Sequence, residues 1–295
     1  MLDDDILQAA LTPPRRVTDH SAWVSHIPFA FALIEMLRPR NFVELGTHNG
    51  DSYCAFCQAV EQQQKSGACR DTRCTAIDTW QGDLSAGFYD ETVLAELRRH
   101  HDPLYASFSK LHRATFAQAA AQFSSGQIDL LHIDGSHSYD EVRADFDRWL
   151  PLISSRGVVL LHDTQVISEG FGVAKLWQEI SAARPHFEFL HGYGLGVLQI
   201  GPEPSPGMQK FFQFAGANPT LLRDLFASLG QRIEFSRTIN RVSAQLAAQI
   251  ETLSAWRAGI GAAPIQPPPS TDKLAWYASL VTGDLNFLTK KDRPR

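Results

Sequence analysis

Two short stretches near the middle of this 295-residue chain concentrate side chains that exchange protons or bind cations: Asp134-Gly-Ser-His137 and His162-Asp163. Each follows an apolar run that is typical of a buried strand. A histidine titrates near neutral pH and suits a general base, whereas paired carboxylates suit a divalent cation such as Mg²⁺. The residue types therefore indicate a site for proton transfer, for binding of a divalent cation, or for both.

Two further acids and a pair of glycines stand earlier in the chain. Glu44 ends the apolar segment 41–45, and the loop Gly46-x-x-x-Gly50 follows it before a helical pattern begins near Ser52. Asp78 ends the next apolar segment. Glycines permit tight turns and close approach of a ligand, and free N–H groups at a helix start favour polar or anionic groups. The stretch predicts a cofactor-binding loop, although an ordinary strand–turn–helix gives the same pattern.

The elements that must position these residues alternate as strand and helix along the chain. Strands are expected at 41–45, 74–78, 108–111, 128–134 and 158–161, each followed by a helical pattern, and residues 187–190 and 195–200 are expected to form a hairpin. This order predicts a doubly wound, Rossmann-like α/β sheet with an antiparallel pair at one edge. Ligands of such sheets bind beyond the carboxyl ends of the strands, where all the acids and histidines above would meet.

The segments outside this core show other sequence patterns. An apolar helix is expected over residues 21–37, broken or kinked at Pro28. Between residues 221 and 256, apolar side chains recur at alternating spacings of four and three, which indicates either a coiled coil or a helix docked on the α/β domain. The seam consists of Phe235, Ile239, Val242, Leu246, the polar Gln249, Leu253 and Trp256.

We therefore predict three segments. Residues 1–201 form the catalytic domain, 202–258 a helical oligomerisation or docking segment, and 259–295 a proline-rich linker and tail. A net charge of −5 argues against a nucleic-acid-binding surface, and no apolar run is long enough to cross a bilayer. The acidic start, Met1-Leu-Asp-Asp-Asp, does not resemble a signal peptide, so a cytoplasmic location is expected.

Several other residues are explained most simply by ordinary packing or by solvent exposure. Cys54, Cys57, Cys69 and Cys74 are expected to pack as small apolar groups, although Cys54-x-x-Cys57 also fits the start of a zinc site. Asp145 and Asp147 lie on a predicted helix and are most simply a solvated face. Trp80, Phe88 and Tyr89 fit either an acceptor platform or lid, or ordinary packing.

A family resemblance sharpens these expectations. Glu44-x-Gly46-x-x-x-Gly50 followed by Asp78 resembles the S-adenosylmethionine site of class I methyltransferases. The stretch from Ile133 to Val142 together with Gly157-Val-Val-Leu-Leu-His-Asp-Thr164 is similar to the small-molecule and sugar O-methyltransferases related to macrocin O-methyltransferase. The resemblance implies a class I methyltransferase fold, S-adenosylmethionine as cofactor, and a hydroxyl of a sugar or another small polar molecule as acceptor.

The same resemblance assigns roles to residues. It implies that the loop from Gly46 to Gly50 lies against the methionine part of the cofactor, with Thr47, Ser52 and Glu44 nearby, and that Asp78 accepts from the ribose hydroxyls. It implies that His137 is the base. It also implies that Asp134 and Asp163 bind a divalent cation, expected as Mg²⁺, and that Asp134 lies beside the cofactor. His162 replaces an acid found in some relatives, which leaves fewer carboxylates. It is expected either to act in catalysis or to orient the residues that bind the metal or the substrate.

Other functions fit parts of the pattern. A metal-dependent oxygenase similar to the cephalosporin hydroxylase group would need an iron site, for which His137, His162 and Asp163 are the obvious set. A non-catalytic, cofactor-binding scaffold with a coiled-coil helix is the third reading. For the methyltransferase, the expected partners are a small-molecule or glycan acceptor, further copies of the chain bound through the C-terminal helix, and a polysaccharide-building assembly.

Overall fold

The computed structural model describes residues 3–19, 22–83 and 87–259. The chain divides into two compact units, residues 1–234 and 235–295. Of the predicted tail, residues 260–295 lie outside the described residues. The functional segmentation at residues 201 and 258 stays a prediction.

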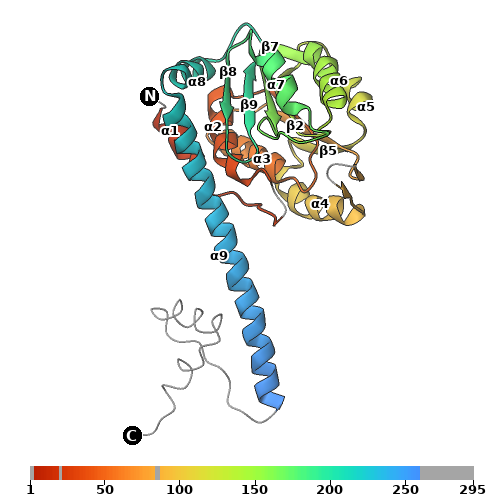
Figure 1. Ribbon diagram of the computed structural model, residues 1–295, viewed down its shortest axis with the longest axis vertical. Coiled ribbons are helices and arrows are strands. Elements are labelled where there is room, and N and C mark those ends of the chain that lie inside the picture. The colour runs from red at the N-terminus through yellow and green to blue at the C-terminus, as the bar shows by residue number, and fades with distance from the viewer. Residues whose placement is uncertain (1–2, 20–21, 84–86, 260–295) are drawn as a thin grey trace. The chain divides into compact units, whose positions relative to one another are not determined.

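A seven-stranded sheet forms the centre of the first unit, in the order β5-β2-β1-β6-β7-β9-β8 (Figure 1). The first five strands in this order run parallel to one another. Strand β9 runs antiparallel to β7, and β8 runs antiparallel to β9. The predicted fold class, a doubly wound α/β sheet with an antiparallel edge pair, is confirmed. The strands are β1 (Asn41–Leu45), β2 (Arg73–Asp78), β5 (Ser109–Arg113), β6 (Ile128–Ile133), β7 (Ile153–His162), β8 (His186–Phe189) and β9 (Leu195–Gln199).

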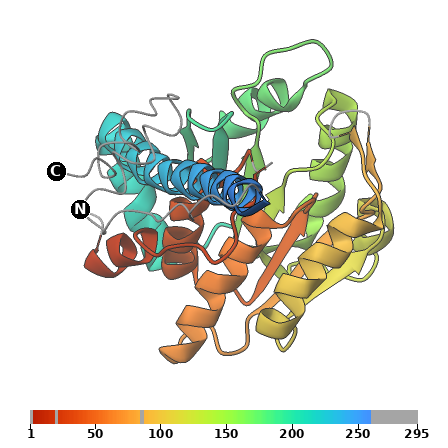
Figure 2. The same ribbon diagram turned by 90° about the horizontal axis from the view of Figure 1, so that it is seen from below.

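Helices cover both faces of the sheet, and a hydrophobic cluster fills each side (Figures 1 and 2). One face carries α2 (Ile27–Leu37), α3 (Asp51–Lys65) and α4 (Glu91–Tyr105). The other carries α5 (Phe116–Ala120), α6 (Tyr139–Trp149) and α7 (Val173–Ser181). The central strands are therefore buried on both faces, which explains their nearly continuous apolar sequences. Smaller elements are α1 (Asp4–Ala10), the 3₁₀ turns η1 (Val24–His26) and η2 (Leu150–Leu152), and the short pair β3 (Gly82–Asp83) and β4 (Gly87–Phe88).

The expected break at Pro28 is present. The turn η1 ends at His26, and α2 begins at Ile27 with Pro28 in its first turn. Proline is tolerated there because the first N–H groups of a helix have no intrahelical acceptor. Every residue of α2 except Glu35 is buried, in accord with its apolar sequence.

Two C-terminal helices begin within the first unit. The Phe211 ring of α8 (Pro206–Ala217) lies 5.6 Å from the ring of Phe29. In α9 (Pro219–Gly259), the Phe226 ring lies 5.5 Å from Phe29 and 5.4 Å from Phe189. Aromatic side chains from both helices therefore complete the core around α2 and β8.

Beyond Glu234, α9 continues as the predicted helix. Five apolar residues of its seam are exposed, namely Phe235, Ile239, Val242, Leu253 and Trp256, whereas Leu246 is buried. Among the described residues, no helix combines the length and apolar character that a membrane crossing requires.

Candidate functional site

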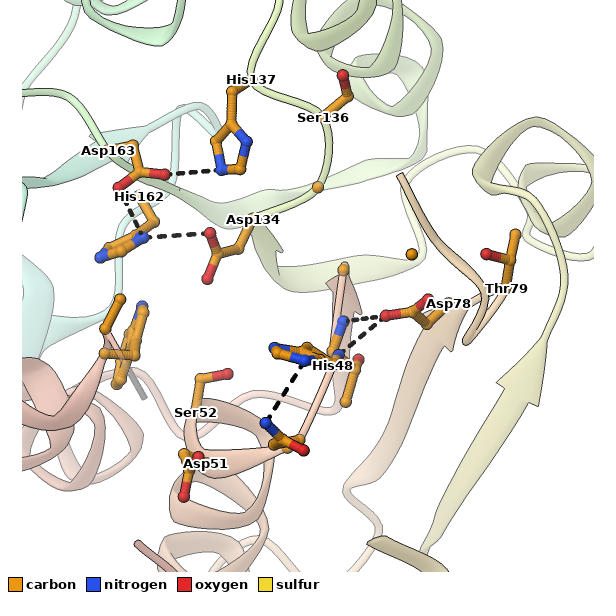
Figure 3. A pocket seen from close by; sticks show the side chains of 18 of the residues that line it. His48, Asp51, Ser52, Asp78, Thr79, Asp134, Ser136, His137, His162 and Asp163 are labelled. Carbon is orange, nitrogen blue, oxygen red and sulfur yellow. Dashed lines mark hydrogen bonds and ion pairs between the residues drawn. The ribbon is translucent and has the colours of Figure 1, made fainter. Parts of the chain in front are cut away.

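A pocket of about 410 Å³ opens at the carboxyl ends of β1, β2, β6 and β7, where the strand order reverses (Figure 3). This is the position at which doubly wound sheets bind ligands. The pocket is lined by nine of the residues that the sequence indicates: Gly46, Thr47, Gly50, Ser52, Asp78, Asp134, His137, His162 and Asp163. Asp51, between Gly50 and Ser52, also lines the pocket, as do Trp23 and Phe116 from segments without a recognisable motif.

The two glycines of the loop are required by protein contacts. Gly46 has a φ of +84°, and a Cβ there would stand 2.0 Å from the carbonyl oxygen of Asp134. Gly50 has a φ of +76° and caps α3, and its Cβ would stand 2.4 Å from the Leu97 side chain. The absence of side chains therefore lets the β1 loop touch the β6 loop and α4, in addition to leaving room for a ligand.

Asp78 holds this loop in place. Its Oδ2 accepts from the backbone N–H groups of Thr47 and His48, at 2.8 and 2.9 Å, and its Oδ1 accepts from Trp80 N at 2.7 Å. A carboxylate offers roughly four acceptor positions, so about one remains for a ligand hydroxyl. The Thr47 hydroxyl is buried at the same place and has no hydrogen-bond partner among the described residues. Both groups are therefore available to a polar ligand in the pocket.

Glu44 lies beneath the pocket and is absent from the residues that line it. It is fully buried, and its Oε2 lies 2.8 Å from Nδ1 of His132, its neighbour in the β1–β6 register. Burial raises the pKa of Glu44, and the contact with His132 partly offsets this effect. Glu44 is thus paired with His132 within the core, and its contact with a cofactor stays a prediction.

Asp134, His137, His162 and Asp163 converge on the other side of the pocket (Figure 3). His162 Nδ1 lies 3.1 Å from Asp134 Oδ1 and 3.3 Å from Asp163 Oδ1. Asp163 Oδ2 lies 2.8 Å from Nε2 of His137, and the ring of Phe171 stacks on His137 at 4.7 Å. The structure therefore brings together all four residues that the sequence indicates for catalysis and metal binding.

The backbone carbonyl of Gly192 orients His162. It lies 3.0 Å from Nε2 of His162 and 3.0 Å from Nε2 of His26. A carbonyl oxygen only accepts hydrogen bonds, so both Nε2 atoms carry hydrogen. Nδ1 of His162 therefore faces the two carboxylates. Sequence reasoning missed His26 and the role of Gly192, whose only signal was a glycine-rich hairpin turn.

The charges of this cluster stabilise one another. Burial alone would lower the pKa of His162, but Asp134, Asp163 and the Gly192 carbonyl raise it to about 9. Burial alone would raise the pKa of Asp134, but the positive charge of His162 holds it well below its ordinary value. Burial, with the charges of His162 and His191, keeps the pKa of His26 well below 6.5, so His26 is neutral.

The cluster fits a divalent cation. One ligand atom from each of Asp134, His162 and Asp163 lies within 4.8 Å of the others, and this is the one such group in the described part of the chain. The iron set considered from the sequence would include His137, which is not a member of this group and whose Nε2 lies 2.8 Å from Asp163 Oδ2. No cysteine belongs to this group; all four thiols are free, and Cys54, Cys57 and Cys74 are buried.

The aromatic residues after Asp78 divide between packing and pocket. Trp80 is buried, and its Nε1 donates to the His48 carbonyl at 3.0 Å, which is a packing role. Tyr89 lines the pocket, with its ring 4.7 Å from that of His48. Phe88 is 77% exposed and is absent from the pocket wall. Of the three, only Tyr89 is placed to contact an acceptor in this structure.

Comparison with known proteins finds a matching curated relative and a family model that matches part of the chain. A protein of Sinorhizobium fredii, named as the uncharacterized protein y4gI, is 45% identical over 206 residues. The match covers 70% of this chain but only 22% of that protein, so the chain spans about a fifth of the length of the curated relative that it matches.

Among solved structures, an S-adenosylhomocysteine-bound methyltransferase of Podospora anserina, PaMTH1, is 13% identical with a TM-score of 0.47, covering 68% of this chain and 88% of that one. The O-methyltransferase TomG of Streptomyces achromogenes, in complex with S-adenosylmethionine, is 13% identical with a TM-score of 0.46, covering 68% and 91%. Residues 43–164 match the family model described as a methyltransferase domain, and this segment contains every site residue indicated by the sequence, from Glu44 to Asp163.

Proposed function

We propose that this protein transfers the methyl group of S-adenosylmethionine to a hydroxyl of a sugar or another small polar acceptor. The observation that carries the proposal is the pocket at the strand-order reversal, which joins a glycine loop held by Asp78 to the cluster around His137. The match of residues 43–164 to a methyltransferase domain supports the same reaction class.

The loop side of the pocket would hold the cofactor. When bound, S-adenosylmethionine supplies an electrophilic methyl group on a sulfonium. The loop from Gly46 to Gly50 would face its methionine part, Asp78 would accept from its ribose hydroxyls, and the Thr47 hydroxyl would hydrogen-bond to one of its polar groups. Because backbone N–H groups hold Asp78 in position, these contacts need little rearrangement when the cofactor binds.

The cluster side would bind the acceptor. A sugar hydroxyl is a weak nucleophile at neutral pH, and His137 takes its proton. Asp163 Oδ2 accepts from Nε2 of His137 at 2.8 Å, so Nδ1 keeps the lone pair that would take the proton, and the acceptor hydroxyl must reach Nδ1, which is shielded from solvent in this structure. A divalent cation would be held by Asp134 and Asp163 and would lower the pKa of the acceptor hydroxyl. With these two carboxylates as its only protein ligands, the expected ion is Mg²⁺. Tyr89 and Phe116 line the pocket walls.

Calorimetry with S-adenosylmethionine tests the cofactor assignment. The expected result is saturable binding at one site per chain, measured both with Mg²⁺ and after treatment with EDTA. S-adenosylhomocysteine should compete for the same site, because it lacks only the transferred methyl group and the positive charge. Failure of both compounds to bind under either condition would overturn the proposed function.

A further inference from the structure

Three atoms in the pocket are spaced as ligands of a single metal ion. His162 Nδ1 lies 3.1 Å from Asp134 Oδ1 and 3.3 Å from Asp163 Oδ1. Adjacent ligands of an octahedral ion with bonds of about 2.1 Å stand about 3.0 Å apart. Ligands of a tetrahedral ion with bonds of about 2.0 Å stand about 3.3 Å apart. Both separations between His162 and a carboxylate agree with either geometry, and ligand atoms of all three residues lie within 4.8 Å of one another.

The orientation of His162 agrees with a role as a ligand. Its Nε2–H donates to the Gly192 carbonyl, and metal-binding histidines commonly donate their second ring N–H in this way. Nδ1 is then the nitrogen that faces the carboxylates. The side chain is 3% exposed, and His26 donates to the same carbonyl, so the packing holds the imidazole in this orientation.

The nitrogen decides which metal the site prefers. Mg²⁺ takes oxygen ligands in a strict octahedron, whereas imidazole suits transition metals, whose affinity for mixed nitrogen and oxygen sites is higher. We propose that the pocket binds a divalent first-row transition metal in preference to Mg²⁺, with Asp134, His162 and Asp163 as its three protein ligands. His162 is thus a metal ligand in its own right, beyond the two carboxylates.

An ion pair is the competing explanation for the same distances. An imidazolium at His162 would donate Nδ1–H to Asp134 and Asp163 and would leave no lone pair for a metal. The two explanations predict opposite results when metal is added, because a ligand must release its proton to the solvent and an ion pair retains it.

Metal titration of the full chain separates them. EDTA-treated protein, without S-adenosylmethionine or acceptor, is titrated with Co²⁺, Mn²⁺ and Mg²⁺ by calorimetry. We expect one Co²⁺ per chain, bound at least about 30-fold more tightly than Mg²⁺, with Mn²⁺ between them. Co²⁺ should also develop visible absorption bands that report nitrogen ligation. Equal affinities for Co²⁺ and Mg²⁺, or no binding of either ion, would show that the cluster is an ion pair or an unselective anionic site.

Substitution of His162 tests the origin of the preference. His162→Glu makes the three ligands all oxygen, so the ratio of Co²⁺ to Mg²⁺ affinity should fall by about tenfold or more. His186→Gln is the matched control, because it removes an exposed histidine of β8 and should leave the ratio unchanged. A ratio that stays unchanged in the Glu variant would overturn the proposal.

A second variant covers the case in which His162→Glu does not fold, which circular dichroism would reveal. Asp163→Asn removes one charged ligand and should weaken Co²⁺ binding by about tenfold or more and alter its spectrum. The inference concerns the pocket of the proposed function but requires no methyl transfer. Protein that binds Co²⁺ selectively but not S-adenosylmethionine would retain the metal site and lose the methyltransferase assignment, and the converse result would do the reverse.

Discussion

At His137, the contact that orients the ring also determines which nitrogen can react. Because Nε2 donates to Asp163, Nδ1 carries the lone pair that would take the proton of the acceptor, and the amide of a glutamine at this position is not basic enough to replace it. His137→Gln should lower kcat by about 10²–10⁴ and leave the affinity for S-adenosylmethionine unchanged. Steady-state methyl transfer and calorimetry measure the two quantities. Phe171→Leu, which removes only the stacked ring, should have a much smaller effect; a His137→Gln enzyme with nearly full kcat would exclude the base role.

Asp78 supports the cofactor loop with both oxygens, so an amide cannot replace it. In Asp78→Asn, one N–H₂ group would face a backbone N–H donor, and a hydrogen bond would be lost at a buried position. We expect a loss of about 1–3 kcal/mol in the free energy of unfolding and weaker cofactor binding. Urea denaturation and calorimetry test both effects, and the exposed Asp71→Asn is the control. Unaltered cofactor affinity would contradict the supporting role.

Asp145 behaves differently from the solvated residue that its helical position suggests. It is half-buried, and burial raises its pKa from 3.8 to about 6. The folded state therefore holds this proton more tightly than the unfolded state, and stability falls as the pH rises from about 4 through about 6.

Asp145→Asn replaces the carboxyl group with a neutral amide and so removes the loss of stability that comes from ionising a half-buried carboxyl group above about pH 4. The variant should be more stable than the natural chain by ~1–2 kcal/mol at pH 8, with a gap that shrinks towards pH 4. Thermal unfolding at several pH values measures the difference. The exposed Asp147, which pairs with Arg143 at 2.7 Å, provides the control substitution, and its effect should not follow this pH profile. A gap that does not change with pH would contradict the assignment.

Among the elements, the β1 loop depends on one close approach. Gly46 and Gly126 both have positive φ values, but an added Cβ meets the Asp134 carbonyl at Gly46 and nothing within 4 Å at Gly126. Each alanine substitution costs about 1–3 kcal/mol from the backbone alone. Gly46→Ala should cost clearly more than Gly126→Ala because the clash is added. Chemical denaturation of the two variants tests this, and equal losses would show that the loop adjusts freely.

The elements were largely predictable because buried parallel strands leave long apolar runs. The apolar stretch 128–133 and its exit at Asp134 appear in the sequence as they do in the fold. The site residues could be grouped for a related reason, since carboxyl ends of parallel strands share one edge. Register was not predictable: nothing in the sequence pairs Glu44 with His132, and this pairing places Glu44 below the pocket.

The contacts that orient His162 were beyond sequence reasoning for another reason. His26 and Gly192 are separated by 166 positions, and no periodicity connects a 3₁₀ turn to a hairpin turn. Their meeting depends on how α2 and the β8–β9 pair pack on the sheet. Tertiary packing alone therefore brings these two groups to His162.

For the whole molecule, the position of a C-terminal truncation matters. A chain that ends at Pro202 loses Phe211 and Phe226, each in the aromatic core around Phe29, and buried phenylalanines contribute about 3–5 kcal/mol each. We expect this chain to unfold or aggregate. A chain that ends at Glu234, the limit of the first compact unit, should keep its thermal stability and cofactor binding. Circular dichroism and calorimetry compare the two chains.

The shorter chain also tests the proposal that α9 joins copies of this protein. The exposed apolar residues from Phe235 to Trp256 follow a heptad spacing that suits a coiled coil. Light scattering should show fewer subunits for the chain that ends at Glu234 than for the full chain. The same subunit number for both would remove the helix from the interface and leave it free for another partner.

The missing Cβ of Gly46 has a consequence for the order of events in the pocket. No side chain separates the β1 loop from the backbone of Asp134, and Asp134 N also donates to the Leu45 carbonyl at 2.8 Å. The two sides of the pocket therefore share a backbone contact. A shift of the loop on ligand binding would therefore press on the backbone of Asp134, so we expect occupancy of the cofactor side to change the positions of the acids and histidines on the other side.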